Sequence, residues 1–233
     1  MHYQFQFNSV LAESGFIMQG ILLTIYLSVG SIILGSIIAI LFSALRANGP
    51  SWVGALVDVY VELLRNTPFL VQLFIIFFGL PSIGIRLSAD QAALLAMTLN
   101  LAAYSTEIIR AGVDSIHRSQ IEAGLSLAMT KRQIFQHVII VPAIAKVWPA
   151  LSSQFVLMLL ASSICSFISV QELSGVTAII EQRTFRSFES YIVATLLYLV
   201  LALTLKVGLL GLGRLIFPRV SGLARVQVKG EAA

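Results

Sequence analysis

Long runs without charged side chains alternate with short charged segments along this chain. The run from Ser14 to Leu45 holds 32 residues without an acid or base, and residues 147–171 hold another 25. Shorter runs cover residues 66–85 and 91–106, and a last run opens at Tyr191. About 20 apolar residues, at ~1.5 Å of rise per residue, cross a hydrocarbon layer of roughly 30 Å. These runs therefore predict membrane-spanning segments.

The pattern predicts an all-α membrane protein, because lipid offers no hydrogen-bond partner to an open backbone and each span must be a helix. Residues 1–233 are expected to form a single transmembrane domain. Its composition agrees, since 58% of the residues are hydrophobic and 11% are charged, against about a quarter charged in a soluble domain. The five predicted spans lie at about residues 16–45, 68–85, 88–111, 147–170 and 190–213.

Lysine and arginine are divided unevenly between the two sides that these spans define. One side holds three basic residues and the other eleven, with Lys206 left inside the last span. Basic residues accumulate on the cytoplasmic side of membrane proteins. The amino terminus is therefore predicted outside and the carboxyl terminus in the cytoplasm. The net charge of +4 then reflects topology and gives no reason to expect nucleic acid.

The predicted cytoplasmic segment 112–146 is longer than a simple connection between two helices needs. It keeps apolar residues at helical spacing, and Thr130 followed by Gln133 is typical of a helix N-cap, which predicts a break between two short helices. Docking on another protein is the favoured interpretation, and a helix lying on the lipid surface is the alternative. The docking candidates are Ile121, Glu122, Ala123, Gly124, Leu125, Ala128, Thr130 and Lys131.

One face of the predicted third span is polar. Asn100, Tyr104 and Glu107 stand at i, i+4 and i+7, so they share a helical face. A carboxylate near the middle of a membrane helix costs ~2.5–3.5 kcal/mol and should meet a cavity or a partner. The face could line a path for a zwitterion, or Glu107 could pair with Arg110 or Arg65.

Two further groups are candidates for the path and its gate. Gln154 must satisfy an amide in the fourth span, whereas Ser162 and Ser163 either line the path or allow close helix packing. The glycines of the last span, at 208, 211 and 213, are expected to be packing residues. A cytoplasmic gate is predicted at the start of the second span, where Thr67 is expected to cap the helix; its residues are Arg65, Asn66, Thr67 and Pro68.

Several motifs together resemble the permeases of ABC importers. Glu122-Ala123-Gly124, followed by Ala128 and Pro142, resembles the EAA loop of that family, with the small residues at 124 and 128 exchanged. Segments typical of the histidine, glutamine and glutamate permease branch, which imports polar amino acids, occur in the family's order from about residue 16 to 217. They are residues 65–72, 78–81, 103–112 and 162–164.

The resemblance implies five transmembrane helices of type I importer architecture, with a cytoplasmic coupling helix, in the bacterial inner membrane. It implies a pathway for a polar amino acid, formed with a second permease copy or paralogue and supplied by a periplasmic binding protein. Two ATP-binding cassette subunits would carry Mg-ATP, and this chain no cofactor. Because Glu107 resembles a residue shared across the family whatever the substrate, its structural role is favoured, and Asn100 is the better path candidate. The polar segment around residues 171–189 is either a landing surface for the binding protein or a solvated loop.

Other functional classes lack their sequence signals. The chain has no Gly-x4-Gly-Lys-Ser/Thr phosphate loop, no His-Glu-x-x-His pattern and a single cysteine, so neither an ATPase nor a metal site is expected. A stand-alone secondary transporter would show an inverted repeat, and a channel a filter-like segment. These two classes stay as the alternatives to the importer permease.

Overall fold

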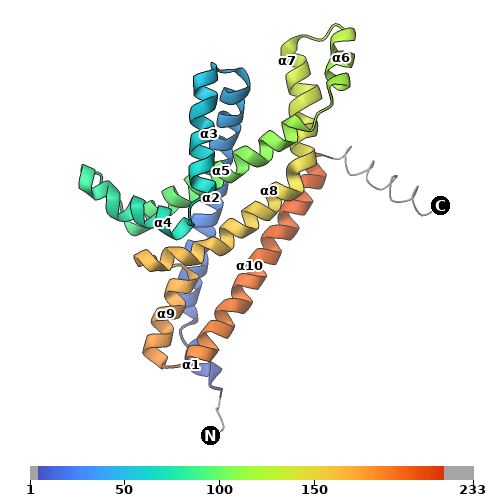
Figure 1. The fold of residues 1–233 in the computed structure, drawn as a ribbon. Helices are drawn as coiled ribbons and strands as arrows, with labels where there is room; N and C mark the ends of the chain where they lie inside the picture. Colours follow the sequence, from blue (N-terminus) through green and yellow to red (C-terminus); the bar gives the residue numbers. More distant parts are fainter. Residues whose placement is uncertain (1–4, 218–233) are drawn as a thin grey trace, which may run out of the picture.

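The computed structural model describes residues 5–217, apart from the side chains of residues 47, 48 and 131 (Figure 1). The basic tail residues counted in the orientation prediction, from 219 onward, lie outside this range. The all-α prediction is confirmed over the described residues. The elements are α1 Phe7–Leu11, α2 Ser14–Asn48, α3 Ser51–Arg65, α4 Phe69–Phe74, η1 Ile75–Gly79, η2 Leu80–Ile83, α5 Ala89–Asp114, α6 Arg118–Ser126, α7 Lys131–Gln133, η3 Ile134–Ile140, α8 Val141–Ala161, η4 Ser162–Ile168, α9 Leu173–Thr184 and α10 Ser187–Ile216.

Four helices of the described range are long and apolar enough to cross a membrane. They cover Ser14–Arg46, Ala89–Asp114, Ile134–Ile168 and Ser187–Ile216. The expected second span at 68–85 is instead the second half of a pair, Ser51–Arg65 and Phe69–Ile83, bent by 108°. Proline at 68 disfavours helical geometry in the residue before it, so α3 ends and the chain turns. A fifth crossing exists only if this bent pair is one span.

Two helices of more than ten residues were not predicted from the sequence. The segment after the first span forms α3, which buries Val57 and Val61 at i and i+4. The segment expected to be a polar loop after the fourth span contains α9, which buries Val176 and Ile180. In both segments a few apolar residues at helical spacing could have predicted the helix. The charged residues beside them led to the prediction of loops instead.

The helix of the fourth span begins earlier than predicted. It runs without interruption from Ile134 to Ile168, although the expected span started at 147. Pro142 lies at the start of α8 and Pro149 inside it. Proline has no N–H to donate to the preceding turn of a helix. Pro142 follows directly on the π-helical η3, whose turns are wider than those of an α-helix.

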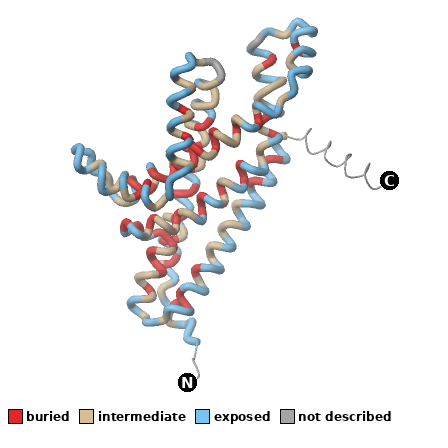
Figure 2. The backbone as a smooth tube through the Cα atoms, viewed as in Figure 1, coloured by how far each residue is buried: buried red, intermediate tan, exposed pale blue. Residues whose placement is uncertain are grey.

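α5 is the central helix, and buried positions recur along its length (Figure 2). In its most apolar stretch 67% of the residues are buried, compared with 11% in α10 at the edge of the bundle. Alanines at 92, 93, 96, 102 and 103 are almost completely buried and let neighbouring helices approach closely. Gly112 lies close against α8, because a Cβ there would lie 2.8 Å from Val147 and 2.9 Å from the Ala143 carbonyl oxygen.

A second buried cluster lies at the opposite end from α6 and α7, where α1, α9 and the start of α10 meet α2 (Figure 1). Glu172 is completely buried there and caps α9, accepting hydrogen bonds from the Ser174 and Gly175 amides at 3.0 and 2.9 Å. The Tyr198 hydroxyl donates a third, short hydrogen bond to the same carboxyl group. Burial raises the pKa of Glu172, and these donors only partly oppose the shift.

Candidate transport path and coupling surface

The predicted gate residues form the turn between α3 and α4, here called the elbow (residues 65–69). Asn66 ends α3 and donates from its amide to the Glu62 carbonyl and carboxylate oxygens, at 2.8 and 2.7 Å. Thr67 was expected to cap α4, and this expectation is wrong. Its hydroxyl donates backward to the Leu63 carbonyl at 2.8 Å, and Pro68 takes the N-cap position without a side-chain hydrogen bond. The proline side chain has no oxygen that could accept from the first α4 amides, so the start of α4 has no side-chain cap. The Thr67 side chain instead bonds to the end of α3.

Gln72 fastens the elbow from the first turns of α4. Its Nε2 donates to the Leu64 carbonyl at 2.7 Å and to the Thr67 carbonyl and hydroxyl oxygens at 3.0 and 2.9 Å. Its Oε1 accepts from Asn100 Nδ2 of α5 at 2.9 Å. Both side chains are 6% exposed, so their amides satisfy one another away from lipid and solvent. Gln72 was not singled out from the sequence, where it stands among apolar residues of α4.

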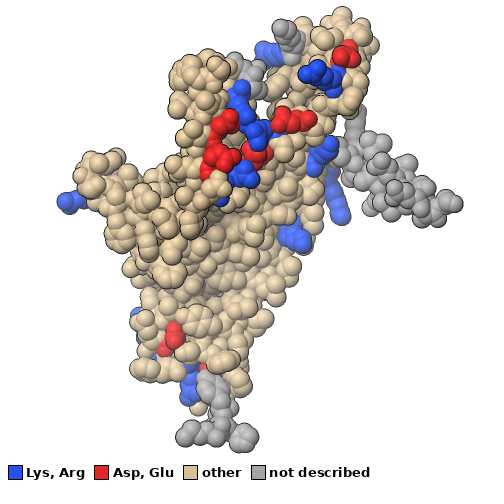
Figure 3. Space-filling view, in the orientation of Figure 1, with Lys and Arg blue, Asp and Glu red and all other residues tan. Residues whose placement is uncertain are grey.

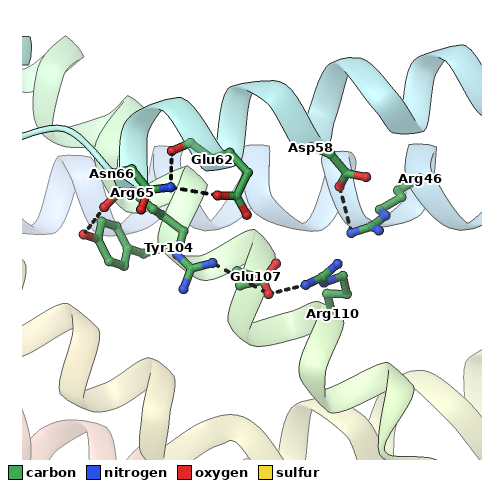
Figure 4. A network of polar contacts seen from close by, with 8 residues as sticks. All are labelled: Arg46, Asp58, Glu62, Arg65, Asn66, Tyr104, Glu107 and Arg110. Carbon is green, nitrogen blue, oxygen red and sulfur yellow. Dashed lines mark hydrogen bonds and ion pairs between the residues drawn. The ribbon is translucent and has the colours of Figure 1, made fainter.

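Tyr104 and Glu107 continue the same face of α5 toward the α6 end and contact the end of α3 (Figure 4). The Tyr104 hydroxyl donates to the Arg65 carbonyl at 3.4 Å, and the Arg65 guanidinium lies 5.7 Å from the Tyr104 ring centre. The Glu107 carboxylate pairs closely with Arg110 and lies 3.7 Å from Arg65. Glu107 therefore joins α5 to α3 through Arg65, while its contact with Arg110 lies within α5.

The polar residues of the fourth span lie at two different depths. The hydroxyl groups of Ser162 and Ser163 donate to the Leu159 and Leu160 carbonyls, at 2.7 and 2.8 Å, where α8 tightens into the 3-10 helix η4. Gln154, just over two turns earlier at 3.6 residues per turn, is half-buried. The two serines therefore have backbone partners in this conformation, as packing residues would. The glycines of the last span, expected to be packing residues, differ in their surroundings. Gly213 packs against Trp148, whereas a Cβ at 208 or 211 would meet nothing within 4 Å.

The predicted docking segment folds into a helical hairpin, here called the coupling hairpin (residues 118–140). It projects beyond the bundle at the end where α2 meets α3 (Figure 1). Thr130 and Gln133 form the expected reciprocal cap, with Gln133 Oε1 2.8 Å from the Thr130 amide and Thr130 Oγ1 3.3 Å from the Gln133 amide. The reversal before this cap is made by Ala128, whose φ of 57° is in the left-handed region. Side chains with a Cβ seldom adopt that conformation.

The two sides of α6 differ in what they contact. Gly124 is buried, and a Cβ there would lie 3.1 Å from Ile134, so it packs inside the hairpin and offers no docking surface. Glu122 and Ala123 are exposed, as are Leu125 and the neighbouring Leu127, at 55% and 78%. Ile121 is half-buried, while Ala128 and Thr130 are exposed. The side chain of Lys131 lies outside the described residues.

Charged side chains gather at the end of the molecule that bears the coupling hairpin, and the middle of the face shown is almost free of them (Figure 3). The cluster includes a second ion pair, Arg46–Asp58 at 2.9 Å between α2 and α3. No group of three or more histidine, cysteine or acidic residues in the described range is placed to hold a metal ion. The arrangement provides a charged, braced end and an apolar middle, which suits a membrane component that is moved from one side.

Comparisons with known proteins agree with this arrangement. Residues 31–222 match the family described as the inner membrane component of binding-protein-dependent transport systems. The chain is 36% identical over 183 residues to the probable glutamine ABC transporter permease protein GlnM of Bacillus subtilis (strain 168), covering 77% of this chain and 81% of that protein. It is 35% identical over 192 residues to the octopine transport system permease protein OccM of Rhizobium meliloti, covering 78% of each.

Comparison of the fold with solved structures gives the same family. The crystal structure of an amino acid ABC transporter with histidines superposes with a TM-score of 0.84 at 32% sequence identity, covering 91% of this chain and 99% of that one. These matches confirm the resemblance drawn from the order of motifs. The chain belongs to the family of inner membrane components of binding-protein-dependent transport systems, as the permease subunit of an ABC importer whose ATPase lies on separate subunits.

Proposed function

We propose that this permease forms, with a second copy of itself or a paralogue, the path by which a polar amino acid crosses the inner membrane. A periplasmic binding protein delivers the amino acid, and two ATPase subunits carrying Mg-ATP dock on the coupling hairpin. The substrate class is supported by the relatives, one of which is named for glutamine, and by the superposed amino acid transporter.

The coupling hairpin is the observation on which this proposal rests. α6 packs through Gly124 on Ile134, and the helix that starts at Ile134 continues without a break to Ile168. A push on the exposed Leu125 and Leu127 is therefore passed along a rigid helix into the membrane. Because packed interfaces switch between discrete arrangements, such a movement can change which side of the membrane the path faces. The hairpin, and with it the carboxyl terminus, lies in the cytoplasm, as the distribution of basic residues favours.

The half-buried Gln154 is assigned to the path, whereas Asn100, bonded to Gln72, and Glu107, paired with Arg65, are assigned bracing roles. A single chain leaves this region incomplete. The side chains of Ile75 and Phe78 on η1 are each 65% exposed, and Phe167 on η4 is 67% exposed. A second permease subunit would cover these apolar surfaces and close the path between the two chains.

Replacing Glu122 with lysine tests the docking surface. The reversed charge should reduce co-purification of the ATPase subunits and amino acid uptake, with the permease still inserted in the membrane. Gln120→Lys is the matched control, because residue 120 lies ~200° around α6 from residue 122 at 3.6 residues per turn. Equal transport by both variants would refute docking at this surface, and full uptake without any ATPase subunit would refute the proposed coupling. The amino acid that raises ATP turnover in the reconstituted complex identifies the substrate.

Cysteine cross-linking tests the second permease. In a Cys165→Ala background, Phe78→Cys should give a cross-linked permease pair with a short bifunctional maleimide. Leu203→Cys, on an α10 side chain that is 50% exposed, should not. Cross-linking from both positions alike would show that the pairing is not at η1.

A further inference from the structure

Two cavities on the membrane-facing side of the bundle join into one groove. The first, of about 350 Å³, lies between the ends of α2 and α5 and the start of the fourth-span helix. The second, of about 370 Å³, lies deeper, between α2, α5, α8 and α10. Ile40, Ile109 and Ile144, one from each of α2, α5 and α8, line both cavities. The groove is therefore continuous from the charged end of the molecule into its apolar middle.

The deep part of the groove is lined almost entirely by hydrocarbon. Trp148, Leu151 and Phe155 form its wall on α8, and the exposed Ile33 and Leu212 stand at its edge. Two serines, Ser36 and Ser105, border this region, and Ser105 is buried at 1% exposure. A lining of this kind suits a hydrocarbon chain, which loses contact with water or gains close packing without needing a polar partner.

The mouth of the groove has a mixed charge. Arg46 and Arg110 line it together with the carboxylate of Asp114. Each arginine already has an acidic partner outside the lining, Asp58 for Arg46 and Glu107 for Arg110. The mouth is thus close to neutral and offers both donors for a phosphate and an acceptor for an ammonium group. A purely anionic head group would leave the Asp114 carboxylate facing a like charge.

The dimensions fit one leaflet of a membrane. From Ser105 to Asp114, α5 rises by ~14 Å at 1.5 Å per residue, about half of the roughly 30 Å hydrocarbon layer. We propose that a phospholipid with a zwitterionic, ethanolamine-type head group occupies this groove. One acyl chain fills the deep cavity, and the phosphate and ammonium meet Arg46, Arg110 and Asp114.

Retention of lipid by the complex of full-length permease tests the proposal. The complex is reconstituted in vesicles of equal parts phosphatidylethanolamine and phosphatidylglycerol, extracted, and analysed by native mass spectrometry. One phosphatidylethanolamine should remain on each permease subunit. Ser36→Phe, which fills the deep cavity, should lose it, whereas Ile37→Phe, on the exposed neighbouring side chain outside the groove, should keep it. Asp114→Asn should shift the retained lipid toward phosphatidylglycerol.

A photoreactive benzophenone amino acid at position 33, on the exposed edge of the groove, separates the possible occupants without filling the deep cavity. An adduct with the mass of phosphatidylethanolamine supports the proposal. An adduct with a peptide, from residues 218–233 of this chain or from another subunit, overturns it. Loss of lipid from the Ser36 and Ile37 variants alike, or equal retention of both lipids by the native chain, also contradicts it.

Discussion

Replacing Gln72 with leucine would test whether the amide pair at the elbow is a structural latch or a part of the substrate path. The leucine removes one bond to Asn100 and three to the end of α3 and the elbow. Stranding a buried polar partner costs ~1–3 kcal/mol in soluble proteins, but side-chain hydrogen bonds inside membrane proteins average only ~0.6 kcal/mol. Because several bonds are lost together, we expect the Gln72→Leu variant to be destabilised by ~2 kcal/mol.

A double-mutant cycle isolates the pair. Asn100→Leu should cost less than Gln72→Leu, because Gln72 keeps its three bonds at the elbow. The double variant leaves no stranded amide between the two helices, so the two costs should fall short of additivity by about 1 kcal/mol. Gln154→Leu, at a half-buried amide on α8, is the control and should change stability little.

Unfolding in mixed micelles measures the stabilities, and uptake by the reconstituted complex measures function. If the pair is a latch, both single variants lower uptake in proportion to their loss of stability. Strict additivity in the cycle would refute the coupling argued from the 2.9 Å contact. A loss of uptake confined to Asn100→Leu, at equal stability, would instead place Asn100 in contact with substrate.

Three other predictions concern the coupling hairpin, the helix crossing and the buried acid. Ala128→Gly should stabilise the hairpin by ~1 kcal/mol, because glycine adopts a φ of 57° without the strain of a Cβ, and slower hydrogen exchange in α6 would show it. Unchanged exchange would contradict this. Gly112→Ala should lower the unfolding midpoint by an amount equivalent to ~1–3 kcal/mol, since its Cβ would approach a backbone oxygen to 2.9 Å. Gly208→Ala is the control and should leave the midpoint unchanged, because a Cβ there meets nothing within 4 Å. Equal midpoints for the two variants would refute the packing argument. The raised pKa of Glu172 means that the folded state holds this proton above pH 4.5, where the unfolded state releases it. Stability should therefore fall as the pH rises from about 4.5 through the raised pKa, and Glu172→Gln, which cannot ionise, should flatten that part of a pH series of unfolding midpoints. A series unchanged by the substitution would be the contrary result.

The site could be predicted only where its determinants are local. The cap made by Thr130 and Gln133 depends on residues three apart, and it was read correctly from them. Thr67 was predicted to cap α4, but its hydroxyl bonds to the end of α3. A hydroxyl between two helices can bond to either one, and the choice depends on the 108° bend between them, which the sequence does not show. Gln72 was missed since nothing near it in sequence reveals that Asn100 lies opposite.

The membrane setting, the helical class and the family follow from the order of residues alone, because hydrophobicity, helix signals and motif order are properties of consecutive residues. Three features could be seen only in the folded chain: α3 and α4 form a bent pair, Gly124 faces inward, and the fourth-span helix extends into the coupling hairpin. Each of these depends on which surfaces meet across the bundle. Lipid and a neighbouring helix are equally apolar to a side chain, so the hydrophobic pattern along the chain cannot tell them apart, whereas close packing and hydrogen bonds can.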